Sequence, residues 1–198
     1  MIAILVLFAL GISISSYFPD NSEEYEELKN LLSPIDDYKT EVTNWDEAKN
    51  ALVDFNYWFE LIPRFNEIDS TDDKIQSLKN NVIQKITKLQ LRMLPKIREF
   101  YTYHLSEILA DDKYKLNVYS FGRSKVIGIT HKRFRWRTGI EKFHIMYLNE
   151  LKILGFNEIR YKWVESENDE QEKYVKYNFT EIKDNELRKF TLAEIEEK

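Results

Sequence analysis

The chain has 198 residues, of which 43% are hydrophobic and 32% are charged, and its formal net charge is −5. This size suits one domain with a real core, or two small ones, once an N-terminal leader is set aside. The absence of cysteine excludes a lipid-modified cysteine, a thiolate metal site and a cysteine nucleophile. It does not exclude export, because a secreted domain of this size can fold without disulfide bonds.

Residues 1–18 carry no charged side chain and are mostly apolar, and an acidic stretch follows from Asp20. The apolar run has the size of a signal-peptide core, roughly 7–15 residues. As a helix, residues 1–18 would reach about 27 Å, which only just matches a bilayer core of about 30 Å. We predict a signal peptide or a membrane anchor, and both place the body of the protein outside the cytoplasm, periplasmic or secreted. The alternative is a buried N-terminal core helix.

Charged residues are distributed in blocks along the chain. Residues 20–73 hold sixteen acids and four bases, and residues 74–142 hold sixteen bases and five acids. The simpler interpretation is that basic and acidic helices pack side by side, so that their fields cancel. The alternative is an exposed cationic face that meets an anionic partner.

The region 20–112 is predicted to form a helical hairpin or bundle with one long helix. A short amphipathic helix over 22–32 ends near Ser33-Pro34. A second helix begins at Thr43 or Asn44, where Thr43 with Asp46, or Asn44 with Glu47, would satisfy the free N–H groups of its first turn. A third helix is predicted from about 73 to 110. Its apolar positions step by three or four residues: Ile75, Leu78, Val82, Ile86, Leu89, Met93, Ile97 and Phe100. The series extends to Ile108, and Pro95 should bend the helix. Oligomerisation through this long helix is a further possibility.

The region 113–180 is predicted to form a ββαββ unit with a small antiparallel sheet. Alternating patterns predict strands over 114–119, 125–130, 159–163 and 175–179. The intervening helix should begin at Thr138, with Glu141 completing a capping box, and should end at Gly155. Residues 181–198 are expected to be a charged C-terminal tail. The predicted fold class is therefore α+β.

The segment Leu151-Lys152-Ile153-Leu154-Gly155-Phe156, a leucine-rich helix end followed by Gly-Phe and a strand, lies within this unit. Together with the leader, the long helices and the two hairpins, it resembles small exported bacterial proteins of unassigned function. The resemblance covers residues 113–180 and, more weakly, the helices. It implies an exported location and this architecture, but no activity and no site residues.

Sequence motifs for catalysis are absent. The three histidines, His104, His131 and His144, do not have a metal-ligand spacing, and no nucleophile elbow, phosphate loop or dinucleotide fingerprint is present. Acid pairs occur at 36–37, 72–73 and 111–112, beside helix ends or in loops, where aspartate typically caps backbone N–H groups. We therefore expect no catalytic residues, no metal site and no cofactor.

The strongest candidate for binding is the segment 131–137, in which four cations alternate with two aromatic side chains. We define residues 132–137 as the cationic loop: Lys132, Arg133, Phe134, Arg135, Trp136 and Arg137. Arg123 and Lys125 in the preceding hairpin are expected to lie near it. Guanidinium groups can bind phosphate or carboxylate, and the aromatic rings can stack on bases or enter a lipid interface. The alternative is that Phe134 and Trp136 both anchor the loop in the core.

These features predict an exported or membrane-anchored, non-enzymatic interaction module whose partner is a protein or an anionic surface. A membrane contact through residues 1–18 is compatible with this prediction. The alternative is a nucleic-acid-binding protein that uses the basic block 74–142, with residues 1–18 as a buried helix. A third possibility is a hydrolase that uses scattered carboxylates.

Overall fold

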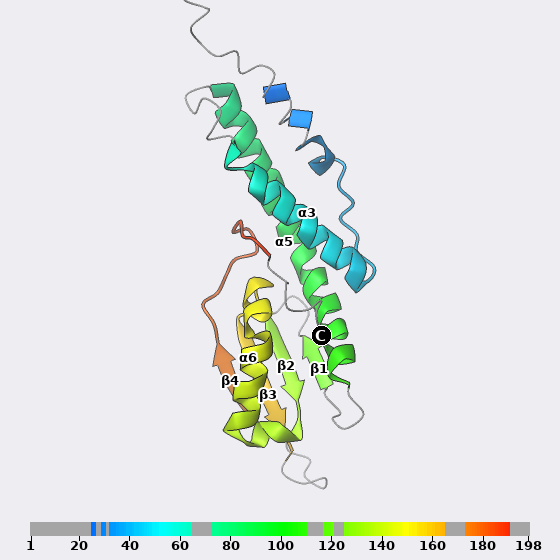
Figure 1. The fold of residues 1–198 in the computed structure, drawn as a ribbon, viewed down its shortest axis with the longest axis vertical. Coiled ribbons are helices and arrows are strands. Elements are labelled where there is room, and N and C mark those ends of the chain that lie inside the picture. The colour runs from blue at the N-terminus through cyan, green and yellow to red at the C-terminus, as the bar shows by residue number, and fades with distance from the viewer. Residues whose placement is uncertain are drawn as a thin grey trace, which may run out of the picture.

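The computed structural model describes residues 25–26, 29–30, 32–64, 73–110, 117–120, 125–164 and 173–190. Helices occupy the N-terminal half, and a four-stranded sheet with one covering helix follows (Figure 1), so the predicted α+β class is confirmed. The predicted leader at 1–18 lies outside the described residues, as does the end of the predicted tail. The 3-10 turn η2 (Ser33–Ile35) lies where the sequence predicts the first helix to stop.

Helix α3 (Trp45–Leu61) begins where its local sequence satisfies the free N–H groups of the first turn. The side chain of Asn44 accepts a hydrogen bond from the Glu47 N–H, while the Glu47 carboxylate accepts one from the Thr43 N–H at 2.7 Å. This reciprocal arrangement confirms the predicted start and stabilises a helix end by about 0.5–2 kcal/mol. The helix ends just before Pro63, whose ring disfavours continued helix.

Helix α5 (Asp73–Leu109) contains Pro95 and extends about 55 Å. It runs antiparallel to α3 (Figure 1), and Trp45 at the start of α3 meets Tyr101 of α5 at a ring-centroid distance of 5.5 Å, so the contact with α3 reaches into the C-terminal half of α5. Most of the predicted apolar stripe is buried. Ile108 is an exception, because it lies near the C-terminal end of the helix and is 40% exposed. The C-terminal half of α5 also packs on the sheet unit, where the Tyr101 and Phe156 rings lie 6.5 Å apart.

The sheet has the order β1-β2-β3-β4, and it is mixed rather than antiparallel as predicted. The strands are β1 (Asn117–Ser120), β2 (Val126–Thr130), β3 (Glu158–Trp163) and β4 (Lys173–Asn178). The two hairpins, β1–β2 and β3–β4, are antiparallel, but β2 and β3 pair in parallel, with Ile127 opposite Ile159. The difference arises because the connection from β2 to β3 is a helical crossover, which returns the chain to the end at which β2 began.

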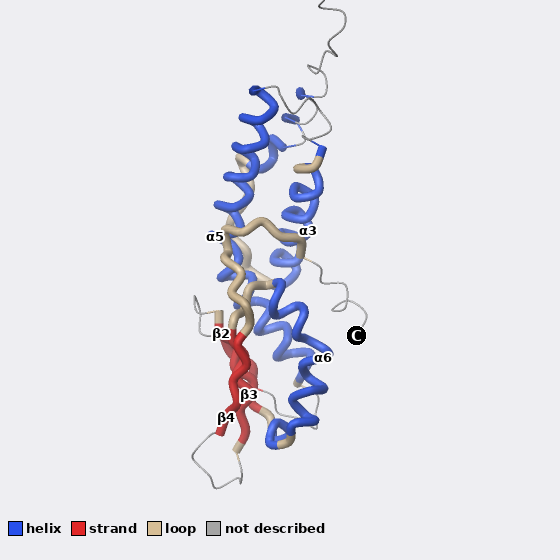
Figure 2. The backbone as a smooth tube through the Cα atoms, turned by 90° about the vertical axis from the view of Figure 1, so that its left-hand side faces the viewer, coloured by secondary structure: helices blue, strands red, loops and turns tan. Residues whose placement is uncertain are grey.

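Helix α6 (Arg137–Ile153) makes this crossover and lies along one face of the sheet (Figure 2). Its buried residues Phe143, Tyr147 and Leu151 belong to the same core as Ile127, Ile129, Ile159 and Tyr161 of the sheet. Gly155 follows the helix with a φ of 82°, a left-handed conformation that favours glycine and ends the helix as predicted. The N-terminal end of α6 therefore lies at the cationic loop, and its C-terminal end lies near α5.

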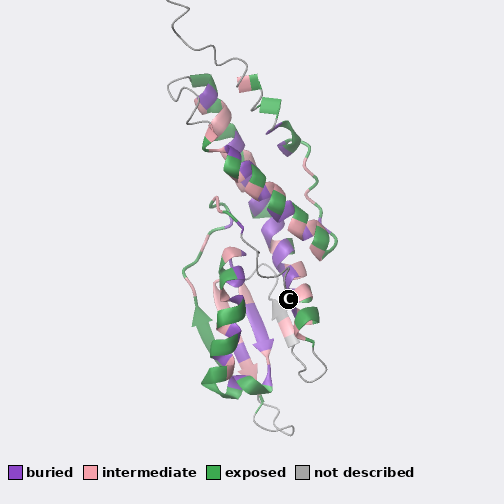
Figure 3. Cartoon of the chain, in the orientation of Figure 1, coloured by how far each residue is buried: buried purple, intermediate pink, exposed green. Residues whose placement is uncertain are grey.

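Residues 181–190, the described part of the predicted tail, run back to the helical half of the molecule and pack against it. Phe190 is buried, and its backbone carbonyl and N–H both bond to the Asn56 side chain of α3 at 2.6 Å. Strand β4, at the sheet edge from which this segment leaves, is exposed along its whole length (Figure 3). The segment therefore carries side chains of residues 181–190 to the junction between α5 and α6.

Candidate cationic interaction surface

The cationic loop is positioned by the end of β2 and by a buried histidine. The His131 N–H donates to the Lys162 carbonyl of β3 at 2.9 Å, which fixes the point where the loop leaves the sheet. The His131 ring nitrogen Nδ1 accepts from the Arg133 N–H at 3.0 Å and so caps the 3-10 helix η3 (Lys132–Arg135). Burial, with a further contribution from the charge of Lys132, lowers the pKa of His131. The neutral ring needed for this cap is thereby favoured.

Phe134 anchors the loop in the core, as one of the two sequence interpretations requires. It is 4% exposed, and its ring meets Tyr161 edge-on at a centroid distance of 4.9 Å and Phe143 at 5.9 Å. Full burial of a phenylalanine side chain stabilises a fold by about 1.5–3 kcal/mol. The packing of Phe134 on Tyr161 and Phe143 therefore anchors the loop to the core.

Gly139 allows the loop to approach the first turn of α6 closely. A β-carbon at this position would lie 2.3 Å from the Arg133 carbonyl oxygen, well inside contact distance. The Trp136 N–H donates to that same carbonyl at 3.0 Å. Helix α6 therefore begins after Trp136 rather than at Thr138 as predicted, because η3 leads directly into its first turn.

The other side chains of the loop face solvent. Trp136 is 57% exposed, which differs from the interpretation that both aromatic residues serve as anchors. The Arg135 guanidinium lies 5.7 Å from the Trp136 ring centroid, within the range of a cation–π contact. Lys132 and Arg133 are exposed, and the exposed Arg137 pairs with Glu141 one turn along α6 at 2.7 Å. The arrangement presents an aromatic face within a cluster of positive charge.

The N-terminus of α6 adds to the positive potential at this surface. The capping residue, Trp136, offers no side-chain acceptor, and the first turn contains no acidic residue. The first N–H groups of a helix carry a partial positive charge and attract anions. Chain geometry and side-chain charge thus favour the same kind of partner.

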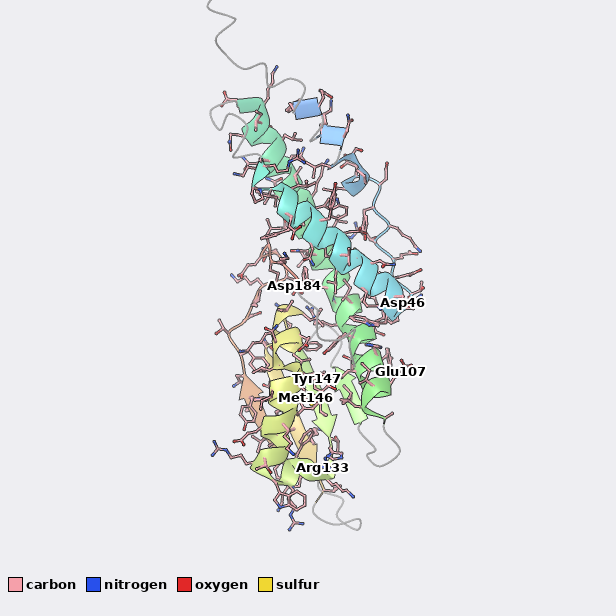
Figure 4. All side chains as sticks on the ribbon, in the orientation of Figure 1. Asp46, Glu107, Arg133, Met146, Tyr147 and Asp184 are labelled. Atoms are coloured by element: carbon pink, nitrogen blue, oxygen red, sulfur yellow. The ribbon has the colours of Figure 1, made fainter. Side chains whose placement is uncertain are left out.

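Lys125 does not belong to this surface, although the sequence analysis placed it there. It precedes β2, whereas the loop follows β2, so the two lie at opposite ends of the strand, roughly 16 Å apart. Its ammonium donates to the Ile182 carbonyl at 2.7 Å and lies 3.5 Å from Asp184. Figure 4 shows the same separation, with Arg133 near one end of α6 and Asp184 near the other. Arg123 lies outside the described residues.

Asp184 belongs to a second polar feature that sequence reasoning missed, a buried cluster with three cations. Arg98 is 1% exposed and binds both carboxylate oxygens of Asp184, at 3.0 and 2.9 Å, and also the Leu154 carbonyl at the end of α6, at 3.1 Å. Lys125 and Arg188 lie 3.5 and 3.7 Å from the same carboxylate. We call Arg98, Lys125, Asp184 and Arg188 the arginine cluster. The sequence signal that could have revealed this cluster is Arg98, a charged residue four positions after Leu94 and therefore on the same buried face of α5.

The ionisation of the cluster follows from its charges. Burial opposes the charged form of Asp184, but the hydrogen bonds and charge of Arg98, together with Lys125 and Arg188, outweigh it and hold the pKa of Asp184 below its ordinary value of 3.8. Burial is also the main cause that lowers the pKa of Arg188, opposed by the charge of Asp184 and reinforced by Arg98. The carboxylate is therefore ionised at neutral pH.

The remaining histidines are packed against aromatic residues. His104 stacks on Trp45 with ring centroids 5.2 Å apart, and His144 shares a hydrogen bond with the buried Tyr161 hydroxyl. Burial lowers the pKa of both imidazoles. Of the acid pairs, Asp36 pairs with Lys85 and Asp73 opens α5, while residues 72, 111 and 112 lie outside the described part.

The described residues contain no group of three or more histidine, aspartate or glutamate side chains that could hold a metal ion. No helix in the same part is both long enough and apolar enough to cross a bilayer. Comparisons with protein-family models, with curated proteins and with solved structures give no match to this chain. The resemblance to small exported bacterial proteins therefore stays a prediction.

Proposed function

We propose that the protein is a non-enzymatic interaction module that works outside the cytoplasm and binds an anionic surface through the cationic loop. The observation that carries this proposal is that one aromatic residue of the loop, Phe134, is buried and the other, Trp136, is exposed. Phe134 anchors the loop in the core, so the fold does not use Trp136 as an anchor, and the Trp136 side chain is exposed. An exposed tryptophan loses hydrophobic stabilisation unless a partner covers it.

The surface that fits this loop best is a bilayer carrying anionic lipid. Tryptophan lies at the headgroup level of membranes, where its ring has an apolar body and a polar N–H, and lysine and arginine attract acidic headgroups. Each cation near such a surface contributes about 1 kcal/mol to binding. The predicted leader at 1–18, if retained as an anchor, would hold the domain near the same bilayer. The leader and the loop would then act as two weak attachments that reinforce each other.

The test is co-sedimentation of the full chain with vesicles that contain anionic lipid, and with neutral vesicles as reference. The double variant Lys132→Gln with Arg135→Gln removes two exposed cations of the loop. At about 1 kcal/mol for each cation, binding should weaken about 30-fold. Trp136→Ala should weaken it further by removing the ring that enters the headgroup layer.

Two matched variants on α6 serve as controls. Lys142→Gln removes an exposed cation, and Ile145→Ala removes an apolar side chain that is 83% exposed. Both should bind anionic vesicles nearly as well as the wild type. Equal weakening by the loop variants and these controls would show that the loop has no special part in binding.

Nucleic acid is the second candidate, and the exposed ring of Trp136 is the observation that favours it. Bases stack on such rings with little regard to sequence, and flanking cations follow the phosphate backbone. A single-stranded oligonucleotide in place of vesicles tests this directly. Fractionation of the host cells with a C-terminally tagged chain then separates the two proposals, because only the bilayer proposal requires the body of the protein to lie outside the cytoplasm.

A further inference from the structure

A hollow of about 590 Å³ lies beside the arginine cluster, between α5 and residues of the returning C-terminal segment. Its rim carries Arg92 and Lys96, which are exposed, and its inner wall is formed in part by the buried Arg98 and Asp184. The full lining consists of Leu91, Arg92, Pro95, Lys96, Arg98, Glu99 and Asp184. Five of the seven lining residues are charged, although the surface that they expose to the hollow is more apolar than polar.

The buried charges next to this hollow do not balance. Three cations, Arg98, Lys125 and Arg188, lie within 4 Å of one carboxylate, that of Asp184. Two other acids lie nearby: Glu181, which is 59% exposed and lies 3.4 Å from Lys125, and Glu99, which lines the hollow and pairs with Lys96 at 2.9 Å. Neither pairs with Arg98 or Arg188. Buried charges are costly unless they are paired. Three cations around one carboxylate leave the cluster with an excess of positive charge, which a further anion would reduce.

Hydrogen-bond donors in the cluster also exceed the acceptors. Among the described residues, the buried Nε of Arg98 and both Nε and Nη2 of Arg188 have no hydrogen-bond partner. The Arg188 Nη1 donates to the Lys183 carbonyl, but its Nη2 only approaches Asp184 at 3.7 Å. An unsatisfied buried donor is unfavourable, and more so when it is charged. Arg188 also lies over the Phe190 ring at 5.3 Å, but this contact and the Lys183 bond leave its Nε and Nη2 without a hydrogen-bond acceptor.

Gly155 places the two guanidinium groups close together at the end of α6. A β-carbon at this position would lie 2.9 Å from Arg188 Nη2, 3.4 Å from Asp184 Oδ1 and 3.5 Å from Arg98 Nη1. Both nitrogens therefore converge over the same glycine. Two converging guanidinium groups provide the donor geometry that recognises carboxylate and phosphate oxygens.

We infer that the arginine cluster and the adjoining hollow form a binding site for an oxyanion, the carboxylate or phosphate group of a small molecule. Of the cluster, Arg98 and Asp184 line the hollow, and Arg188 adjoins them beside Gly155. The anion accepts hydrogen bonds from Arg98 and Arg188, while Arg92 at the rim attracts it from solution. Asp184 positions Arg98 and offsets one of the three positive charges of the cluster. This site lies at the opposite end of α6 from the cationic loop, and it does not depend on the function proposed for that loop.

The experiment is a thermal-unfolding titration of the full chain with inorganic phosphate and, separately, with acetate, at constant ionic strength set with chloride. A ligand of the folded state raises Tm in a saturable manner. We expect such a rise, and Arg188→Gln should weaken the apparent affinity about tenfold. Lys183→Gln makes the same charge change at an exposed neighbouring residue and should leave the affinity unchanged.

A second measurement on the wild-type protein does not depend on the folding of any variant. Phosphate or acetate should shift the arginine Nε–H resonances of Arg98 and Arg188 in a two-dimensional nitrogen–proton spectrum. A response to phosphate alone assigns the site to a phosphate group, and a response to acetate alone assigns it to a carboxylate. The inference is overturned if neither anion shifts these resonances, or if Lys183→Gln weakens binding as much as Arg188→Gln.

Discussion

The substitution Asp184→Asn tests how the two halves of the molecule are joined. The Asp184 carboxylate receives two hydrogen bonds from Arg98 of α5, and Arg98 also binds the last carbonyl of α6. Asparagine has nearly the same volume, so the change creates no cavity. It removes the negative charge and leaves Arg98, which is 1% exposed, without its ionic partner.

The expected loss can be estimated from this burial. Breaking a buried ion pair by removing one partner lowers the free energy of unfolding by about 3–5 kcal/mol. For a protein of this length, 1 kcal/mol corresponds to about 2–4 °C in Tm, so the expected decrease is about 6–20 °C. Glu181→Gln, which alters an exposed pair with Lys125, should cost only about 0–1 kcal/mol and is the matched control.

Urea unfolding at pH 7, followed by circular dichroism, measures both variants. The dependence on pH provides a second check, because the pKa of Asp184 is depressed in the folded state. Its stabilisation is present above the ordinary value of 3.8 and is lost as the pH falls through the lower folded-state value. The difference between wild type and Asp184→Asn should therefore shrink in acid. A loss below about 1 kcal/mol at pH 7 would refute the argument from burial.

Three further predictions follow from individual residues. Gly155→Ala should destabilise the protein by about 1–2 kcal/mol in urea unfolding, because residue 155 has a φ of 82°; an unchanged midpoint would contradict this. Gly139→Ala should displace the Arg133 carbonyl, which would lie 2.3 Å from the new methyl group, and should shift the amide resonances of residues 132–136. Unshifted resonances would mean that this close approach is absent. Burial, with repulsion from nearby lysines, lowers the pKa of all three histidines, so proton resonances of the His104, His131 and His144 rings should titrate below pH 6.5. The stability due to their neutral forms is present above pH 6.5 and declines as the pH falls from there toward the folded-state values. A value above 6.5 for any of them would contradict the described packing.

The helices were predicted well because the caps and apolar spacings that define each helix involve residues only a few positions apart in the sequence. The capping residues Asn44 and Glu47 are three positions apart, and the stripe of α5 repeats every three or four residues along one element. Such patterns depend on backbone geometry alone. The order of strands and helix in the ββαββ unit was predictable for the same reason, since each element shows its own periodicity.

The pairing between elements was not predictable in the same way. The parallel β2–β3 pair depends on where α6 returns the chain, and the alternating pattern of a strand is the same for either direction of its neighbour. The placement of Lys125 was wrong for a related reason. Its proximity in sequence to the cationic loop suggested a shared surface, but an extended strand separates them.

The candidate sites show the same limit. Arg98 was visible as a charge within an apolar helix, but its partner Asp184 is 86 residues away. In the cationic loop, sequence alone could not tell which aromatic side chain points inward. The 3-10 turn decides this, because it directs Phe134 toward Tyr161 and leaves Trp136 at the surface.

The most direct test of the proposed function is the fluorescence of Trp136 during titration with anionic vesicles. Trp136 is 57% exposed, whereas Trp58 is buried and Trp45 and Trp163 are partly buried, so a change in its environment should be visible above their signal. If the loop binds the bilayer, the emission should shift to shorter wavelength and become protected from a soluble quencher, and Trp136→Phe should abolish both effects. An unchanged spectrum at saturating lipid, or the same shift in Trp136→Phe, would contradict the proposal.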